Sequence, residues 1–305
     1  MPKLLQTHLL VGYTRKVCNV LCTYKYRLYH LAYTHVFVSL LSDANILTTL
    51  QSFATNKKSG YERESAAIGF QYLASVLGTP VAPILLPYLP LIMDLYMDKG
   101  DVVRIAATAA AKTLLKLLPP ESTHIAFRQL EDILEKGKWR TKVGALDSIR
   151  GFTDRAKDEV ASELVTVLPK VELAMHDTKP EVSTAAKKCA TALCTTVANP
   201  DLTPHIPILV ECMSNPSSVP SCMKALSSTT FVAEVTAPAL AVVVPLLLRA
   251  LNDRSMEVQR RTVVVIDNLV KLVRDPAVAA RYLSTLVEGV EKIYRGAAFP
   301  EVNHI

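Results

Sequence analysis

Four basic side chains surround the only tryptophan of the chain. The stretch reads Glu135-Lys136-Gly137-Lys138-Trp139-Arg140-Thr141-Lys142. Basic groups bind phosphate oxygens, and an aromatic ring offers a face on which a nucleotide base or a cation can stack. One interpretation is an exposed contact with RNA or with a protein. The other is that Trp139 packs back into the protein core while the lysines are ordinary solvated turn residues, and the sequence leaves both open.

A second basic stretch, Asn56-Lys57-Lys58-Ser59-Gly60, has the polar composition of an exposed turn. Together the two stretches give the candidate RNA-binding residues, which are Lys57, Lys58, Lys136, Lys138, Trp139, Arg140 and Lys142. Binding through such local patches is the only nucleic-acid contact that we expect, since basic residues do not coat the whole surface.

Two cysteines and two histidines near the amino terminus, Cys18, Cys22, His30 and His35, raise the question of a zinc site. The gap between the two pairs is shorter than in the usual zinc finger, and no carboxylate lies nearby to orient the ligands. We therefore predict no metal site.

Sequence motifs for catalysis are missing. The chain has no G-x-x-x-x-G-K-[ST] loop, no G-x-G-x-x-G and no H-E-x-x-H. His124, His176 and His205 stand singly, and a lone helical histidine is usually structural. We expect no catalytic and no cofactor-binding residue, and hence not an enzyme but a binding protein.

Residues 237–275 show most clearly the kind of structural element that the basic turns belong to. Apolar residues recur at helical spacing from Leu240 to Leu251, the pair Asn252-Asp253 interrupts them, and a second apolar stripe runs from Val258 to Val273. This pattern predicts a helical hairpin whose inner faces are apolar. One such hairpin is too small to bury those faces by itself.

The hairpin pattern repeats along the chain. A proline precedes a polar turn residue by eight positions in four places, which are Pro90 and Asp98, Pro169 and Asp177, Pro207 and Asn215, and Pro245 and Asp253. Anchor residues that follow these turns recur about every forty residues, the period of HEAT repeats with two helices each. We expect the proline to kink the first helix and the Asp or Asn to accept backbone N–H groups at the start of the second.

These repeats predict an all-α fold, a HEAT/armadillo-type right-handed α-solenoid of about six to seven helical hairpins. Residues 43–305 form the solenoid, truncated at its carboxyl-terminal end. A bundle of unrelated helices is the alternative, although a bundle needs no fixed spacing between proline and turn residue. In the helix from Asp101, a face of small and apolar residues is expected to pack closely against a neighbour: Val102, Ile105, Ala106, Ala109, Ala110 and Leu114.

Residues 1–42 do not follow the repeat. They carry five basic residues and no acidic one, so that most of the net charge of +6 belongs to this segment and little to the repeats. We interpret them as an irregular leader, disordered or mispredicted as coding sequence. The repeat cysteines Cys189, Cys194 and Cys222 fall within apolar stripes and are expected to be reduced core residues of a cytoplasmic protein. The most apolar run, Val81 to Met93, is interrupted by prolines, so we expect a buried helix and no membrane span.

Three stretches resemble the amino-terminal HEAT region of the fungal translation elongation factor 3 family. They are Lys138-Trp139 with Lys142, the sequence TTFVAEVT from Thr229 to Thr236, and Ile266-Asp267-Asn268-Leu269 with the residues up to Pro276. The similarity covers roughly residues 45–295. A related general-control protein that senses stalled ribosomes shares Phe231-Val232 but not the Ala-Glu-Val that follows, which favours the elongation factor or its close paralogue.

The resemblance implies a ribosome-dependent ATPase of the ABC-F type as the full-length protein, whose ATP is bound by cassettes that this chain lacks. It implies that the HEAT region docks on ribosomal RNA and ribosomal proteins, in support of translation elongation and release of tRNA from the exit site. We expect a cytoplasmic monomer with further protein partners along the solenoid. The alternative function is a generic HEAT interaction scaffold, such as a stress-signalling ribosome sensor or a tubulin or transport adaptor.

Overall fold

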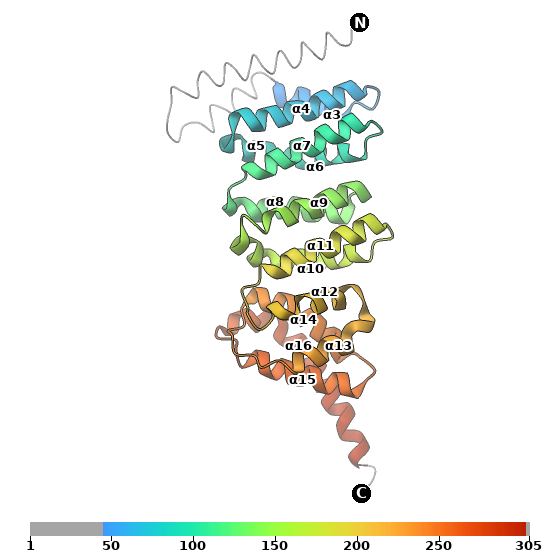
Figure 1. The fold of residues 1–305 in the computed structure, drawn as a ribbon, viewed down its shortest axis with the longest axis vertical. Helices are drawn as coiled ribbons and strands as arrows, with labels where there is room; N and C mark the ends of the chain where they lie inside the picture. The colour runs from blue at the N-terminus through green and yellow to red at the C-terminus, as the bar shows by residue number, and fades with distance from the viewer. Residues whose placement is uncertain (1–44, 303–305) are drawn as a thin grey trace. The chain divides into compact units, whose positions relative to one another are not determined.

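The structure is a computed structural model that describes residues 45–302, with side chains through residue 296. The chain divides into two compact units, residues 1–149 and 150–305. Within the described range, every regular element is an α-helix or a short 3₁₀ turn (Figure 1). The predicted all-α class and its organisation in helical hairpins are confirmed. The leader predicted for 1–42, with Cys18, Cys22, His30 and His35, lies outside the described residues.

The first unit contains three successive hairpins from residue 45 onward, and the last helix of the third extends three residues past the boundary at residue 149. Its elements are α3 (Ile46–Thr55), α4 (Gly60–Leu77), η1 (Thr79–Val81), α5 (Ala82–Leu85), η2 (Leu86–Tyr88), α6 (Leu89–Asp94), η3 (Leu95–Met97), α7 (Asp101–Leu117), η4 (Pro120–Ser122), α8 (Thr123–Lys136) and α9 (Trp139–Phe152), the η elements being 3₁₀ turns. α4 packs along α7 and against α3, so that the apolar stripes of neighbouring hairpins share one interior.

The second unit continues the same alternation up to a long last helix. Its elements are α10 (Lys157–Met175), α11 (Pro180–Thr195), η5 (Thr203–His205), α12 (Ile206–Ser214), η6 (Pro216–Ser218), α13 (Val219–Ser227), α14 (Ala237–Leu251), α15 (Met256–Val270) and α16 (Pro276–Val302). α10 packs against α11 and also against α14, and the short α12 contacts both α11 and α14. The four cysteines in the described part of this unit, Cys189, Cys194, Cys212 and Cys222, are buried and unbridged.

The Asp or Asn at the inter-helix turn accepts a backbone hydrogen bond, as predicted. In five hairpins its side-chain oxygen accepts a hydrogen bond from the backbone N–H two residues later, at 2.8 to 3.1 Å: Asn56 from Lys58, Asp98 from Gly100, Asp177 from Lys179, Asn215 from Ser217 and Asp253 from Ser255. The hairpin of α8 and α9 uses Gly137 instead, where a Cβ atom would overlap the carbonyl oxygen of Ile133. The predicted turn chemistry is therefore confirmed.

The repeated proline has two structural outcomes. Pro169 and Pro245 lie inside the continuous helices α10 and α14, as expected. Pro90 and Pro207 instead lie in the first turn of α6 and α12, each preceded by a 3₁₀ turn. Proline is tolerated at the first turn because the N–H that it lacks has no intrahelical partner there. In these two repeats the first helix is divided into segments and not simply kinked.

The apolar stretch Thr79–Met97 contains the prolines of the second repeat. It is 19 residues long and its mean hydropathy reaches 1.4, so by length and composition alone it could cross a membrane. Its helical segments are short, however, and half of it is buried. Leu85, Leu89, Ile92 and Met93 are fully buried in the first unit. This burial agrees with the prediction that the stretch lies in the protein core.

The face of α7 that packs against its neighbours differs from the predicted one. Its buried residues are Val103, Ala106, Ala107, Ala110, Ala111, Leu114 and Leu115. Val102 and Ile105 are exposed by 57% and 68%, so the prediction that they line the packed face is wrong. The helix has alanine or valine on most of its circumference, so periodicity does not define which stripe is inward.

An ion pair joins the first two turns of the first unit. The Arg63 guanidinium on α4 donates to both Asp98 carboxylate oxygens, at 2.5 and 3.2 Å, and to the carbonyl oxygen of Asn56 at 2.7 Å. Both side chains are largely buried, with 17% and 6% exposed. The hydrogen bond from Arg63 lowers the pKa of Asp98; burial opposes this, while the Gly100 N–H and the charges of Arg63 and Arg104 add to it.

This lowered pKa makes the stability of the first unit sensitive to acid. A carboxylate whose pKa is lower in the folded state stabilises the fold above its unfolded pKa of about 3.9, and this stabilisation is lost as the pH falls through the folded value. We expect Asp98→Asn to lower the free energy of unfolding by about 2 kcal/mol at pH 6. The difference from wild type should shrink below about pH 4, as measured by urea unfolding at pH 6, 4 and 3.

The control for this prediction is Asp275→Asn. Asp275 also accepts a backbone hydrogen bond two residues on, at 2.9 Å from Ala277, but no ion pair to it is found among the described residues. Its variant should differ from wild type by less than about 0.5 kcal/mol at every pH. An Asp98→Asn effect that is equally large at pH 3 and pH 6 would contradict the assignment to the ion pair.

Candidate functional site

The turns that join α3 to α4, α6 to α7 and α8 to α9 lie at one edge of the first unit (Figure 1). Each turn carries at least one exposed lysine. We call this group the basic edge; its members are Lys57, Lys58, Lys99, Lys136 and Lys138. The structure thus brings together the two basic stretches singled out in the sequence. It adds Lys99, which the sequence analysis did not single out. This lysine could have been recognised from its position between Asp98 and Gly100, in the same kind of turn.

Specific contacts hold neighbouring turns of the basic edge together. Arg63 binds both the first turn, through Asn56, and the second, through Asp98. The second and third turns meet where α9 begins. There the Thr141 hydroxyl donates to the carbonyl oxygen of Met93 at 3.4 Å, and Gly144 lies directly against the ring of Tyr96. These contacts fix the distance between lysines that are far apart in the sequence.

The lysines of the basic edge differ in how far their charges are compensated. Lys136 lies 3.3 Å from the Asp132 carboxylate, one helical turn away. For Lys57, Lys58, Lys99 and Lys138, no ion pair is found within residues 45–296. Partial burial raises the pKa of Asp94, and the positive charge of Lys138 opposes this shift. Lys138 therefore has a favourable electrostatic interaction with the Asp94 carboxylate. Four of the five lysines of the basic edge thus have no ion-pair partner in the described part of the chain.

The side chain of Trp139 is half-buried. Its exposure therefore lies between the exposed contact and the core position that the two interpretations predict. The guanidinium carbon of Arg140 lies 4.8 Å from the centroid of its ring, a cation–π distance. Arg140 and Lys142 are themselves half-buried. The predicted cluster around the tryptophan thus splits into two exposed lysines, Lys136 and Lys138, and a half-buried group in the first turn of α9.

In the second unit, the sequence TTFVAEVT forms a non-helical connection, residues 228–236, between α13 and α14. The second helix of this hairpin, α13, therefore ends at Ser227 after nine residues. The Asp201 carboxylate accepts hydrogen bonds from the N–H groups of Val232 and Ala233, both at 2.7 Å. The N–H of Val235 donates to the carbonyl oxygen of Leu272 at 3.1 Å. Residues distant in the sequence thus accept the hydrogen bonds from backbone N–H groups that would be satisfied within a helix.

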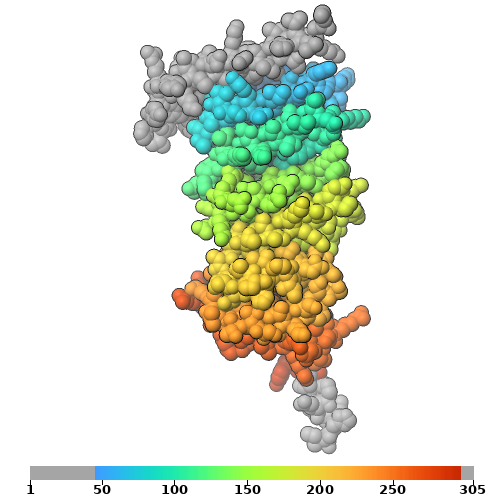
Figure 2. All heavy atoms as spheres, viewed as in Figure 1, coloured from blue at the N-terminus to red at the C-terminus, as the bar shows by residue number. Residues whose placement is uncertain are grey.

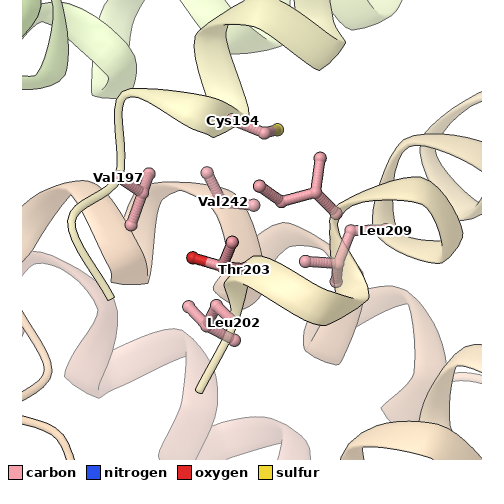
Figure 3. Close-up of a pocket in the computed structure, with 7 residues that line it drawn as sticks. Cys194, Val197, Leu202, Thr203, Leu209 and Val242 are labelled. Atoms are coloured by element: carbon pink, nitrogen blue, oxygen red, sulfur yellow. The ribbon is translucent and has the colours of Figure 1, made fainter. Parts of the chain in front are cut away.

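A small apolar pocket lies nearby in the same unit, between the end of α11, the start of α12 and α14 (Figure 3). Its cavity volume is only about 10 Å³, and its lining consists of Cys194, Val197, Leu202, Thr203, Ile206, Leu209 and Val242. Burial raises the pKa of the Cys194 thiol to about 12, so the thiol is protonated and a poor nucleophile at neutral pH. Within the described residues, no group of three His, Cys, Asp or Glu side chains could hold a metal ion.

Comparison with known families accounts for both units. Residues 31–190 match the model of the EF3 N-terminal HEAT repeat, and residues 217–305 match that of the elongation factor 3/GNC1 HEAT repeat. The first match covers more than half of the chain. The chain belongs to the elongation factor 3 family. Its matches to family models fall on the HEAT region, the part that the resemblance in the sequence indicated.

Individual members of the elongation factor 3 family are similar over most of this chain. The mRNA export factor elf1 of Schizosaccharomyces pombe is 45% identical over 265 residues, which are 86% of this chain and 25% of that protein. Elongation factor 3 of Phytophthora infestans is 41% identical over 226 residues, 74% of this chain and 22% of that protein. Elongation factor 3A of Saccharomyces cerevisiae is 33% identical over 250 residues, which are 80% of this chain and 24% of that protein. The chain thus spans about a quarter of the length of these relatives.

Proposed function

We propose that this chain is a ribosome-docking HEAT module of an elongation factor 3-like protein. The observation that carries the proposal is the basic edge, where Lys57, Lys58, Lys99 and Lys138 are exposed on three successive turns with no ion pair among the described residues. Relatives of the chain carry the name elongation factor 3. In this proposal the lysines contact rRNA phosphates, and neighbouring surfaces contact ribosomal proteins.

Lysines at hairpin turns suit a phosphate backbone better than a small ligand. They lie on a rigid framework, and each ammonium is a point charge on a flexible stem, so it can follow an irregular RNA surface. Binding of this kind releases counterions and weakens steeply as salt is raised. Trp139, Arg140 and Lys142 stay in the proposed interface, with Arg140 and Trp139 acting as a stacked pair at its border.

Ribosome co-sedimentation tests the proposal. We expect the purified chain to pellet with ribosomes in low salt and to be released as salt is raised. The double variant Lys57→Glu/Lys58→Glu should bind at least about tenfold more weakly, because two attractive charges become repulsive. Lys138→Glu alone should show a smaller loss in the same direction.

The matched control is Lys187→Glu/Lys188→Glu on α11, which reverses two adjacent exposed lysines of the second unit. This control should sediment like wild type. Equal losses in both double variants would assign binding to net charge, and no loss in either would remove the basic edge from the interface.

The wider role in the proposal follows the family resemblance. The chain acts as a cytoplasmic anchor, monomeric and without a membrane contact, in support of translation elongation and release of exit-site tRNA. It binds no cofactor and hydrolyses no ATP itself, because the resemblance places ATP in cassettes that are separate from the HEAT region. An ATPase assay of the purified chain with and without ribosomes checks this part.

A second function is favoured by the 45% identity to a protein named mRNA export factor. In that case the same basic edge would bind messenger RNA or a protein bound to it. Crosslinking in cells separates the two functions. Recovery of rRNA supports ribosome docking, and recovery of polyadenylated RNA without rRNA supports export.

A further inference from the structure

Large apolar side chains are exposed on α4 and α7 in the first unit. We call them the apolar face; they are Tyr61 (62% exposed), Ile68 (38%), Val102 (57%) and Ile105 (68%). Single exposed apolar residues are ordinary on protein surfaces, whereas a cluster indicates an interaction site. Whether these four form a cluster depends on the helix geometry.

Their spacing places these residues together. Tyr61 and Ile68 are seven positions apart and Val102 and Ile105 three, so each pair lies on one side of its helix. α4 and α7 pack side by side along their length, and their atoms form a continuous blue to blue-green surface in the space-filling view (Figure 2). Half-exposed Ala109 extends the stripe on α7 by one more turn. The apolar face therefore lies on two helices that are direct neighbours.

Lysines border the apolar face at both ends. Lys57, Lys58 and Lys99 lie at the turn end, and Lys112 and Lys116 follow Ile105 and Ala109 on the same side of α7. The acidic groups on this side are Glu64, which is half-buried, and Asp101, which forms an ion pair with Arg104. For the five lysines, no ion pair is found within residues 45–296. The surroundings of the patch are thus electropositive.

We propose that the apolar face binds an acidic amphipathic helix of a partner protein. Branched aliphatic side chains such as Val102 and Ile105 give no flat surface for base stacking, which single-stranded RNA would need. They are instead complementary to apolar side chains at positions i, i+3, i+4 and i+7 of a helix laid across them. Glutamates flanking that stripe would meet the lysines at either end. This partner is additional to the RNA contact proposed for the basic edge.

Fluorescence anisotropy with a synthetic probe tests the proposal without ribosomes. The probe is a labelled peptide of about 18 residues, or five helical turns, with leucines in the i, i+3, i+4, i+7 stripe and glutamates beside it. We expect saturable binding to the whole chain. Ile105→Glu should weaken binding at least about tenfold by placing a charge in the patch and repelling the peptide. Lys112→Glu/Lys116→Glu, which leaves the apolar residues in place, should weaken it as well.

Matched controls make the result decisive. Val264→Glu changes an aliphatic residue on α15 that is 50% exposed, and it should leave binding within about twofold of wild type. A scrambled peptide of the same composition should not bind. Equal binding of the scrambled peptide, or unchanged binding in Ile105→Glu with an unaltered thermal transition, would overturn the proposal. An oligouridine of similar length that displaces the peptide and itself loses affinity in Ile105→Glu would show that the face binds RNA instead.

Discussion

Replacing Arg249 with methionine is expected to lower the free energy of unfolding of the second unit by about 2–3 kcal/mol. Arg249 on α14 pairs with the Glu172 carboxylate on α10 and donates to the carbonyl oxygen of Cys212 on α12 at 2.8 Å. It therefore joins the first helices of three successive repeats. Breaking a fully buried ion pair costs roughly 3–5 kcal/mol, because one charge is left without a partner. The expected effect is smaller because Arg249 is 32% exposed, although Glu172 is only 16% exposed.

Thermal unfolding measured by calorimetry checks this expectation. A loss of 2–3 kcal/mol corresponds to a fall in Tm of about 4–12 °C for a unit of this size. Arg260→Met on α15 is the control, since Arg260 is exposed and no ion pair to it is found among the described residues; it should change stability by less than about 0.5 kcal/mol. The double variant Arg249→Met/Glu172→Met should recover part of the loss, because it leaves no unpaired charge. A double variant less stable than either single variant would contradict this account.

Gly144→Ala is expected to destabilise the first unit by about 1–3 kcal/mol through overpacking. A Cβ atom at this position would overlap Cε2 of Tyr96, lie 2.7 Å from its Cδ2 and 3.3 Å from Cε of Met93. The Tyr96 ring is buried and has little room to move; burial raises its pKa to about 12, with a hydrogen bond to Thr108 opposing this shift. The steric cost should exceed the helix-propensity gain of alanine over glycine, about 1 kcal/mol.

Gly151 on the same helix provides the matched control. A Cβ atom there has no neighbour within 4 Å, so Gly151→Ala should be neutral or stabilising by up to about 1 kcal/mol. In a Tyr96→Leu background, Gly144→Ala should cost less than in wild type, because the two substitutions act on one contact. Urea unfolding of the four variants gives these values, and an equal loss for both glycine variants would rule out the contact with Tyr96 as the cause.

Features that depend on neighbouring residues in the chain could be predicted from the sequence. A side-chain oxygen at Asp98 or Asp253 needs only its own turn to accept the N–H two residues later. The hairpins follow from apolar stripes at helical spacing, and their repetition predicts a shared interior. The basic stretches around Lys57 and Lys138 were likewise visible, because a turn between two amphipathic helices must lie at the surface.

Features that depend on packing between distant residues came from the tertiary structure. Periodicity placed Val102 and Ile105 on the packed side of α7, but the side that α4 covers is the neighbouring alanine-rich stripe. Asp201 holds residues 228–236 out of a helix through two hydrogen bonds that span about thirty positions.

By itself, then, the sequence determined the all-α class, the turns, the repeat and the family, because each rests on local hydrogen bonding or on a pattern of residue types. The tertiary structure decided which residues become neighbours. Arg249 reaches two earlier repeats, and Gly144 against Tyr96 fixes one turn beside another. Lysines from three turns form one basic edge, and four apolar residues form one face. These arrangements depend on how side chains of different repeats fit together, which no single repeat encodes.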